Sequence, residues 1–289
     1  MPIHSALDVL LFGLGALLAG RRFRDGTESP SLFQLIEGGR VILPDGWEGD
    51  GLHDVVAHTP SGPLQLGVRS VTGDREPKAF VIYHHGLGEI PFDYGFSRLL
   101  LPPPPGTALF ALRAAHHGSR RGPATAMASL EEFATTLAAS VLLMQAIIEG
   151  LDPRKPIVVA GTSIGGFLAN AHQVRYGTAD TYVPIMAGLA TDHIITGTIY
   201  GRGFVPLDGA AKSRIASALN MEDRADALDP DRTFPILARR DRIVEYERQR
   251  ASYGGLSVET MQKGHITGAV AYGRLRRHIL GALDAARRA

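Results

Sequence analysis

The chain has 289 residues, of which 45% are hydrophobic and 20% are charged, as expected of a soluble globular protein. A chain of this length buries enough surface to fold without a metal ion or a disulfide. Its 30 basic and 29 acidic residues give a formal net charge of +1, which argues against a nucleic-acid-binding surface. The absence of cysteine excludes thiol catalysis and thiolate zinc sites, so serine, histidine and carboxylates remain as candidates.

The N-terminal part contains one apolar stretch, residues 9–20, with Asp8 before it and Arg21 and Arg22 after it. It is shorter than the roughly 20 apolar residues that span a bilayer, and it lacks the preceding positive charge of a secretory signal. We therefore expect residues 1–39 to form an N-terminal helical extension of a cytoplasmic protein. Its apolar helix would pack on the protein body or in a homodimer contact, with peripheral membrane contact as the alternative.

Strand patterns dominate the chain from about residue 40. Short strands joined by Gly, Pro and Asp turns predict an antiparallel start to a sheet. These strands are expected at 41–43, 54–58 and 64–71. The apolar runs that follow are typical of strands buried on both faces. They cover 79–83, 107–114, 156–160, 182–186, 235–238 and 256–261.

Helical patterns separate the later strands. Apolar spacings of three and four predict helices over 129–151, from Gly161 to Tyr176, and over 270–286. This alternation predicts an α/β fold, with a largely parallel sheet covered by helices on both faces. Residues 189–232 fit the alternation poorly, so we expect them to form an insertion over the carboxyl edge of the sheet.

The run Gly161-Thr162-Ser163-Ile164-Gly165 has the pattern G-x-S-x-G and lies between a predicted strand and a predicted helix. A serine on such a tight turn projects its hydroxyl from the sheet edge, and only very small residues fit two positions to either side. The following helix directs its free N–H groups toward the same point. Ser163 is therefore the candidate nucleophile, although the bare pattern also arises by chance and needs support from its context.

Two further regions supply that context. The strand at 79–83 runs into the turn H-H-G-L-G, whose Leu87 N–H is expected to bind an oxyanion together with the N–H of Ile164. Two late strands lead to Asp241 and then to His265. The chain order Ser, Asp, His is the one that this arrangement of strands requires for a catalytic triad.

On these residues, the chain resembles the α/β-hydrolase superfamily from about residue 40 to its end. The shared motifs are H-G-x-G at 85–88, which includes Gly86, G-x-S-x-G at 161–165, D-x-x-V at 241–244 and G-H at 264–265. The resemblance implies an eight-stranded, mostly parallel sheet with an initial antiparallel strand and a small cap after the sixth strand. It assigns 40–188 and 233–289 to the hydrolase core, and 189–232 to the cap.

Several residues have competing interpretations. Asp192, just after the sixth strand of the implied eight-stranded sheet, is the alternative to Asp241 as triad acid and is otherwise a candidate pocket residue. Asp241 could instead pair with neighbouring arginines on the surface. We expect His85 and His116 to contribute to the pocket wall or to hydrogen bonding, like the adjacent His84 and His117, without acting as catalysts. Adjacent histidines do not present two ligands on one helix face, so we expect no metal site, and no cofactor is implied.

The implied reaction is two-step acyl transfer to water through an acyl-enzyme on a small-molecule ester. Apolar and aromatic residues within 189–232 suit a small-to-medium hydrophobic acyl group, which favours a carboxylesterase. A lipase, a thioesterase, a C–C bond hydrolase or a perhydrolase would share the same motifs. A non-catalytic, hydrolase-like ligand-binding protein is a further alternative. Serine at the elbow argues against dehalogenase and epoxide hydrolase chemistry, which needs a carboxylate there.

Overall fold

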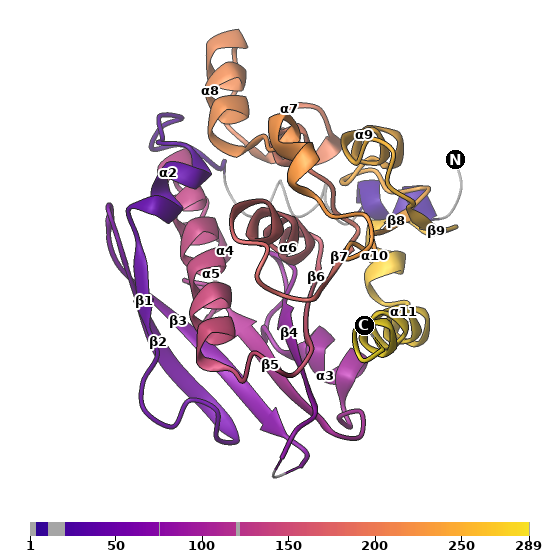
Figure 1. Cartoon of the computed structure of the whole chain (residues 1–289). Helices are drawn as coiled ribbons and strands as arrows, with labels where there is room; N and C mark the ends of the chain where they lie inside the picture. Colours follow the sequence, from indigo (N-terminus) through magenta and orange to yellow (C-terminus); the bar gives the residue numbers. More distant parts are fainter. Residues whose placement is uncertain (1–3, 11–20, 75, 120–121, 289) are drawn as a thin grey trace.

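The computed structural model describes residues 4–10, 21–74, 76–119 and 122–288. Over these residues, nine strands form one sheet in the order β1-β2-β3-β5-β4-β6-β7-β8-β9 (Figure 1). The strands are β1 Arg40–Ile42, β2 Gly51–Thr59, β3 Gly62–Thr72, β4 Ala79–His84, β5 Thr107–Arg113, β6 Ile157–Thr162, β7 Thr181–Ile185, β8 Ile236–Ala238 and β9 Glu259–Met261. Pairing is antiparallel from β1 to β5 along this order, and parallel from β5 to β9.

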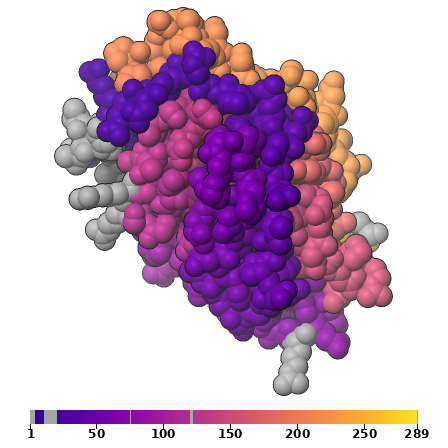
Figure 2. All heavy atoms as spheres, turned by 90° about the vertical axis from the view of Figure 1, so that its left-hand side faces the viewer, coloured from indigo at the N-terminus to yellow at the C-terminus, as the bar shows by residue number. Residues whose placement is uncertain are grey.

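The mostly parallel α/β sheet confirms the predicted fold class, but the implied number of eight strands is wrong. The additional strand is β1, which pairs antiparallel with β2 through Arg40, Val41 and Ile42. The residue patterns indicate a strand at 41–43, whereas the family resemblance counts one strand fewer. The antiparallel strands form one outer side of the molecule, which Figure 2 shows in indigo and purple.

Helices cover both faces of the sheet. The bounds are α2 Leu32–Glu37, α3 Tyr94–Leu100, α4 Gly122–Thr125, α5 Leu130–Gly150, α6 Ile164–Arg175, α7 Thr191–Thr196, α8 Gly209–Leu219, α9 Tyr246–Ser252, α10 His265–Ala269 and α11 Tyr272–Ala286. Helices α5 and α6 pack on one face, and α3 and α11 lie together against the other. The alternation along β4 supplies both cores, since Phe80 and Ile82 join one cluster while Val81 and Tyr83 join the other.

Helix α5 begins where the sequence places a capping serine. The Ser129 hydroxyl accepts from the N–H of Glu132, and Glu131 and Glu132 complement the positive end of the helix. Among the described residues, α5 alone is long and apolar enough to cross a membrane, but 78% of its apolar window is buried inside the fold. Its apolar composition is therefore explained by its place as the core helix that packs with α6 on one face of the sheet.

The segment 189–232 connects β7 to β8 through helices and loops that add no strand to the sheet, and it lies at one end of the molecule, drawn in orange in Figures 1 and 2. It contains α7, α8 and two 3-10 helices, η1 Ile199–Gly203 and η2 Glu222–Ala227. The domain boundaries at 189 and 232 stay predictions. Residues of this segment nevertheless contribute to the wall of the candidate site described below.

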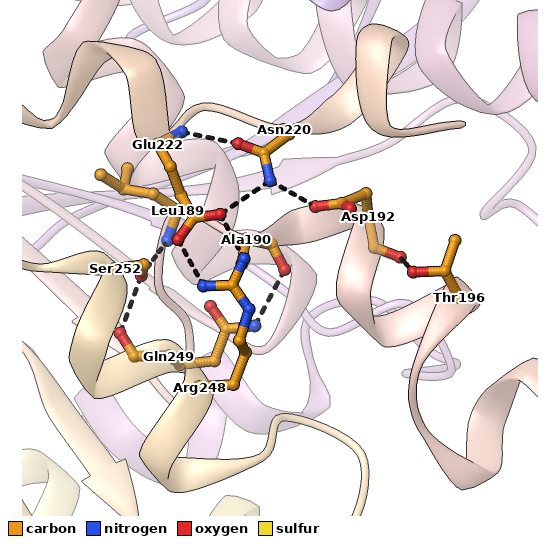
Figure 3. Close-up of polar contacts among 9 residues, drawn as sticks. All are labelled: Leu189, Ala190, Asp192, Thr196, Asn220, Glu222, Arg248, Gln249 and Ser252. Atoms are coloured by element: carbon orange, nitrogen blue, oxygen red, sulfur yellow. Dashed lines mark hydrogen bonds and ion pairs between the residues drawn. The ribbon is translucent and has the colours of Figure 1, made fainter. Parts of the chain in front are cut away.

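A polar network fastens this segment to α9 (Figure 3). Asn220 donates to Asp192 at 2.7 Å and to Glu222 at 2.9 Å, and Glu222 also pairs with Arg248 of α9. The amide of Gln249 donates to the carbonyl of Ala190 at 2.9 Å. Because these contacts join the two ends of the segment to one helix, they fix its position over the sheet.

The N-terminal extension is described only in part. Residues 4–10 are helical, whereas most of the predicted apolar helix at 9–20 lies outside the described residues. The homodimer or membrane contact assigned to it stays a prediction. Further along, Phe23 is buried between Phe133 and Phe204, with ring centroids 6.2 and 4.8 Å away. Residues after 21 thus pack between α5 and the segment 189–232.

Candidate active site

Ser163 occupies a strained turn between β6 and α6. Its φ of 56° and ψ of −120° lie in a region that side chains other than glycine rarely adopt. The surrounding hydrogen bonds hold this conformation, since the Ser163 N–H donates to Ile185 and its carbonyl accepts from Gly166 and Phe167. Such strain costs about 1–3 kcal/mol and is common where a side chain must be aimed at a ligand.

The glycines of the elbow meet the predicted crowding. A Cβ on Gly161 would lie 2.3 Å from backbone atoms of Gly165, and one on Gly165 would lie 2.1 Å from the carbonyl oxygen of His84. Gly86 differs, because a Cβ there would lie 3.6 Å from its nearest neighbour, the Thr162 carbonyl oxygen, which is ordinary contact. The close approach of strand and helix therefore requires glycine at 161 and 165.

Strand register brings the other candidate residues to the same edge. Parallel pairing of β4 and β6 sets His84 beside Gly161, so the turn after β4 emerges next to the elbow. Pairing of β8 and β9 sets Ala238 beside Met261, so the following loops also emerge together. The carboxyl ends of parallel strands thus collect four loops that are far apart in the sequence.

Ser163, His265 and Asp241 lie in one chain of hydrogen bonds. Nε2 of His265 is 3.0 Å from the Ser163 Oγ, and its Nδ1 is 2.7 Å from Oδ2 of Asp241. The other Asp241 oxygen accepts from the N–H groups of Ile243 at 2.8 Å and Val244 at 2.7 Å. A carboxylate held this way only accepts, so Nδ1 carries a proton and Nε2 can accept from the serine hydroxyl.

The protonation of His265 reflects its neighbours. Burial lowers its pKa, but the carboxylates of Asp241 and Asp8 outweigh that effect, so the pKa lies above the ordinary value of 6.5. The side chain of Asp241 is fully buried, and its ion-pair partner is His265. This imidazole therefore gains stability as an imidazolium, the form that a general base reaches after taking a proton.

The residues of the two competing interpretations of the triad acid have other partners in the structure. Asp192 accepts from Asn220 in the network of Figure 3, so it belongs to the attachment of the segment 189–232. The neighbouring Arg239 stacks over the ring of Tyr246 at 4.6 Å, while the ion pair of Asp241 is with His265. The structure thus places Asp241 beside His265, and it places Asp192 in the polar network.

The Leu87 N–H is oriented through the carbonyl of the same peptide unit. That carbonyl, on Gly86, accepts from Nδ1 of His85 at 2.8 Å and from the N–H of Glu89 at 3.1 Å. The Leu87 carbonyl lies 2.7 Å from Nε2 of His117. Leu87 and Ile164 both line the pocket beside Ser163, and no hydrogen bond within the described chain uses either N–H.

His84, His85 and His117 form a buried cluster behind this turn. The ring of His85 lies 4.7 Å from His84 and 4.5 Å from His117, centroid to centroid. Burial, reinforced by these two rings, holds the pKa of His85 well below its ordinary value, and burial lowers the pKa of His84 to about 4. A neutral His85 fits its contacts, because Nε2 accepts from the Ala114 N–H at 3.1 Å.

The predicted pocket-wall residues do not reach the pocket. Among the described residues that line it, His85, His116 and Asp192 are missing. His85 contacts the turn after β4 through the Gly86 carbonyl, and His116 points to Glu132, with Nε2 and Oε1 2.7 Å apart. The physical reason is local geometry: the positive φ of 66° at His116 turns its side chain toward α5.

The pocket is a cavity of about 520 Å³ with Ser163 and His265 in its wall. This is within the range of ligand pockets. Most of the lining is apolar, including Leu87, Ile164, Met127, Phe133, Ile194, Ile195, Ile243 and Ile266. Polar groups come from Glu89, Tyr94, Tyr272 and Arg22. Within the described chain, no group of three or more His, Asp or Glu residues is arranged to hold a metal ion.

Sequence reasoning missed two carboxylates near the site. Glu89 accepts from the N–H groups of Gly86 and Gly95, and burial raises its pKa to about 7 despite these bonds. Its position directly after the H-G-L-G motif is a signal that could have identified it. Asp8 contacts the His265 loop, but it lies 257 residues away and no local pattern connects the two.

The fold is that of the α/β hydrolases. Acetyl xylan esterase 1 from Thermoanaerobacterium sp. JW/SL YS485 aligns with a TM-score of 0.58 and 13% identity, over 90% of this chain and 95% of that one. An acetyl xylan esterase from Paenibacillus sp. R4 aligns at 0.56 and 16% identity, over 96% and 94%. Est1E from Butyrivibrio proteoclasticus, with ferulic acid bound, aligns at 0.53 and 16% identity, over 76% and 96%. No protein-family model and no curated protein matches the sequence.

Proposed function

We propose that this protein is a serine hydrolase that cleaves carboxylic esters through an acyl-enzyme. The observation that carries the proposal is the hydrogen-bonded chain from Ser163 Oγ to His265 Nε2 at 3.0 Å, and from His265 Nδ1 to Asp241 at 2.7 Å. This chain opens into a largely apolar cavity of about 520 Å³. Nucleophile, base and orienting acid are the parts that acyl transfer needs.

In the first step, Ser163 Oγ attacks the ester carbonyl carbon while His265 Nε2 takes the hydroxyl proton. The N–H groups of Leu87 and Ile164 donate to the oxyanion of the tetrahedral intermediate. When the intermediate collapses, the bond to the alcohol oxygen breaks and His265 returns its proton to the leaving alcohol. Asp241 keeps the imidazole in the productive tautomer and stabilises its charged form.

In the second step, water attacks the acyl-enzyme carbonyl and gives its proton to His265. The same two amides hold the second oxyanion, and collapse releases the carboxylic acid and regenerates Ser163 with the proton from His265. The sequence of bonds made and broken needs no reactant besides the ester and water.

The cavity supports an ester with a small-to-medium hydrophobic acyl group. Its apolar wall from Met127, Phe133, Ile194 and Ile195 offers van der Waals contact to an alkyl or aryl chain, whereas a volume of about 520 Å³ limits chain length. The alignment with two acetyl xylan esterases agrees with ester cleavage. We also propose a cytoplasmic location, as expected from the sequence.

The test is labelling of the full-length protein by a fluorophosphonate probe, followed by turnover of p-nitrophenyl esters of increasing acyl length. We expect the probe on Ser163, turnover that is highest for short and medium chains, and loss of both in Ser163→Ala. Ser213→Ala is the matched control, because Ser213 is an exposed serine of α8 whose hydroxyl donates to the carbonyl of Gly209 in the same helix. Labelling of another residue, or full turnover by Ser163→Ala, would refute the proposal. Labelling with no turnover of any ester would favour a ligand-binding protein.

A further inference from the structure

The N-terminal helix, residues 4–10, lies against the two loops that carry the candidate acid and base (Figure 1). The hydroxyl of Ser5 donates to the carbonyl of Arg240 at 3.0 Å. Arg240 is the residue before Asp241. Asp8 has 0% of its surface exposed. A buried carboxylate is costly unless its oxygens are hydrogen-bonded, so its contacts define its role.

The hydrogen bonds that Asp8 accepts come from these two loops. Its Oδ2 accepts from the N–H of His265 at 2.8 Å and from the N–H of Arg242 at 3.3 Å. Its Oδ1 accepts from the N–H of Ile266 at 3.1 Å. One carboxylate thus bonds the backbone on both sides of the imidazole–carboxylate pair, from an element more than 200 residues away in the chain.

Gly264 provides independent support for this contact. A Cβ at Gly264 would lie 2.7 Å from Oδ2 of Asp8 and 2.7 Å from the carbonyl oxygen of His4. Real Cβ atoms do not come this close, so the N-terminal helix can approach the base loop only because the residue before His265 is glycine. The glycine of the G-H motif and the position of Asp8 are therefore coupled by packing.

We propose that Asp8 is a positioning residue for His265, and that residues 4–10 clamp the acid loop to the base loop. The proposal rests on the proposed function for its effect on turnover. With the carboxylate in place, the backbone at His265 and at Arg242 shares one acceptor, which fixes how the imidazole meets both Ser163 and Asp241. Misplacement by about 1 Å at such a site costs on the order of 100-fold in rate.

The carboxylate also acts on His265 electrostatically. Two carboxylates act on this imidazole, Asp241 on the loop after β8 and Asp8 on the N-terminal helix. The basic residues Lys263 and Arg242 lie close in sequence to His265 and Asp241, within the two loops. Burial lowers the pKa of His265, and Asp241 followed by Asp8 raises it. Loss of the Asp8 charge should therefore lower the pKa of His265, whereas a role in folding alone would leave that pKa unchanged.

The experiment compares full-length wild type with Asp8→Asn and Asp8→Ala. Asn keeps one acceptor oxygen and removes the charge, whereas Ala removes both. We expect kcat to fall by about tenfold in Asp8→Asn and further in Asp8→Ala, with KM within about twofold. The acid limb of the kcat/KM profile should move to lower pH in both variants. The control is Asp208→Asn, which removes an exposed carboxylate that caps α8 through Ala211, outside the pocket lining.

A second measurement does not depend on turnover. Titration of the His265 imidazole by NMR, in Ser163→Ala with and without Asp8→Asn, should show a lower pKa when Asp8 is replaced. Unchanged kcat, acid limb and imidazole pKa in folded Asp8→Asn would overturn the inference. If wild type neither reacts with the probe nor turns over esters, the proposed function fails by itself, and the imidazole titration then shows separately whether Asp8 acts on His265.

Discussion

Nδ1 of His85 donates to the carbonyl oxygen of Gly86 at 2.8 Å, and this carbonyl belongs to the same peptide unit as the Leu87 N–H. Since a peptide unit is planar, a bond that fixes the carbonyl also fixes the direction of the N–H on its opposite side. His85 therefore orients the Leu87 N–H from behind the pocket, although its own side chain does not line the pocket.

Replacing His85 should weaken the proposed oxyanion site while leaving Ser163, the proposed nucleophile, in place. We expect His85→Ala to lower kcat by about 10- to 100-fold, somewhat less than loss of an oxyanion donor itself, with little change in KM. His116→Gln is the control, because His116 contacts Glu132 away from the pocket. Steady-state kinetics on a p-nitrophenyl ester measure the effect, and equal kcat values for His85→Ala and wild type would contradict it.

The pH dependence should follow the raised pKa of His265. Burial lowers this pKa, but Asp241 and Asp8 outweigh it, so it lies above 6.5. Below that pKa the imidazole holds a proton and cannot accept one from Ser163, so kcat/KM falls by about tenfold per pH unit on the acid side. A profile between about pH 5 and pH 9 tests this. An acid limb with its midpoint clearly below 6.5 would show that the carboxylates do not act as described.

Glycine at position 163 should relieve the strain of the elbow. The φ of 56° is unfavourable for serine and costs glycine little, whereas glycine adds entropy to the unfolded chain. We expect Ser163→Gly to raise the free energy of unfolding by up to about 2 kcal/mol while abolishing ester turnover. Urea denaturation compares it with Ser163→Ala, which keeps the Cβ and thus most of the strain. A loss of stability in Ser163→Gly relative to Ser163→Ala would refute the strain argument.

A methyl group at Gly165 should not fit. Its Cβ would lie 2.1 Å from the backbone carbonyl oxygen of His84, so β4 and α6 would have to move apart. We expect Gly165→Ala to lower the free energy of unfolding by about 3 kcal/mol or more. Gly209→Ala on α8 is the matched helical control, since a Cβ added there would have no neighbour within 4 Å among the described residues. Comparable denaturation curves for the two variants would contradict this prediction.

Local patterns in the sequence were sufficient for most of the fold. The apolar run at 79–83 became β4, and the spacing over 129–151 became α5, because periodicity records directly which side of an element is buried. The ninth strand was visible as residues 41–43, and only the family resemblance left it out. The ends of the strands were the least accurate. Strand β9 covers only Glu259–Met261 of the predicted 256–261, and β2 extends over Gly51–Thr59, beyond the predicted 54–58.

The candidate site was predictable only where a short motif records its own geometry. The tight turn at Ser163 demands glycine at 161 and 165, so the spacing of these residues in the sequence is enough to predict the turn. The sequence favours Asp241 over Asp192 only through chain order and the late strand that precedes it. Which of the two lies beside His265 depends on the loops that the pairing of β8 and β9 brings together.

What the sequence alone determined is the set of strands, the long helices α5, α6 and α11, and the sharp turn that carries Ser163. These follow from residue size, periodicity and backbone freedom over a few positions. Only the tertiary structure decided that Asp8 lies against His265, that His85 orients the Leu87 peptide, and that Asp192 joins a polar network. These relationships depend on contacts between segments far apart in the chain, and such contacts leave no periodic pattern in either segment.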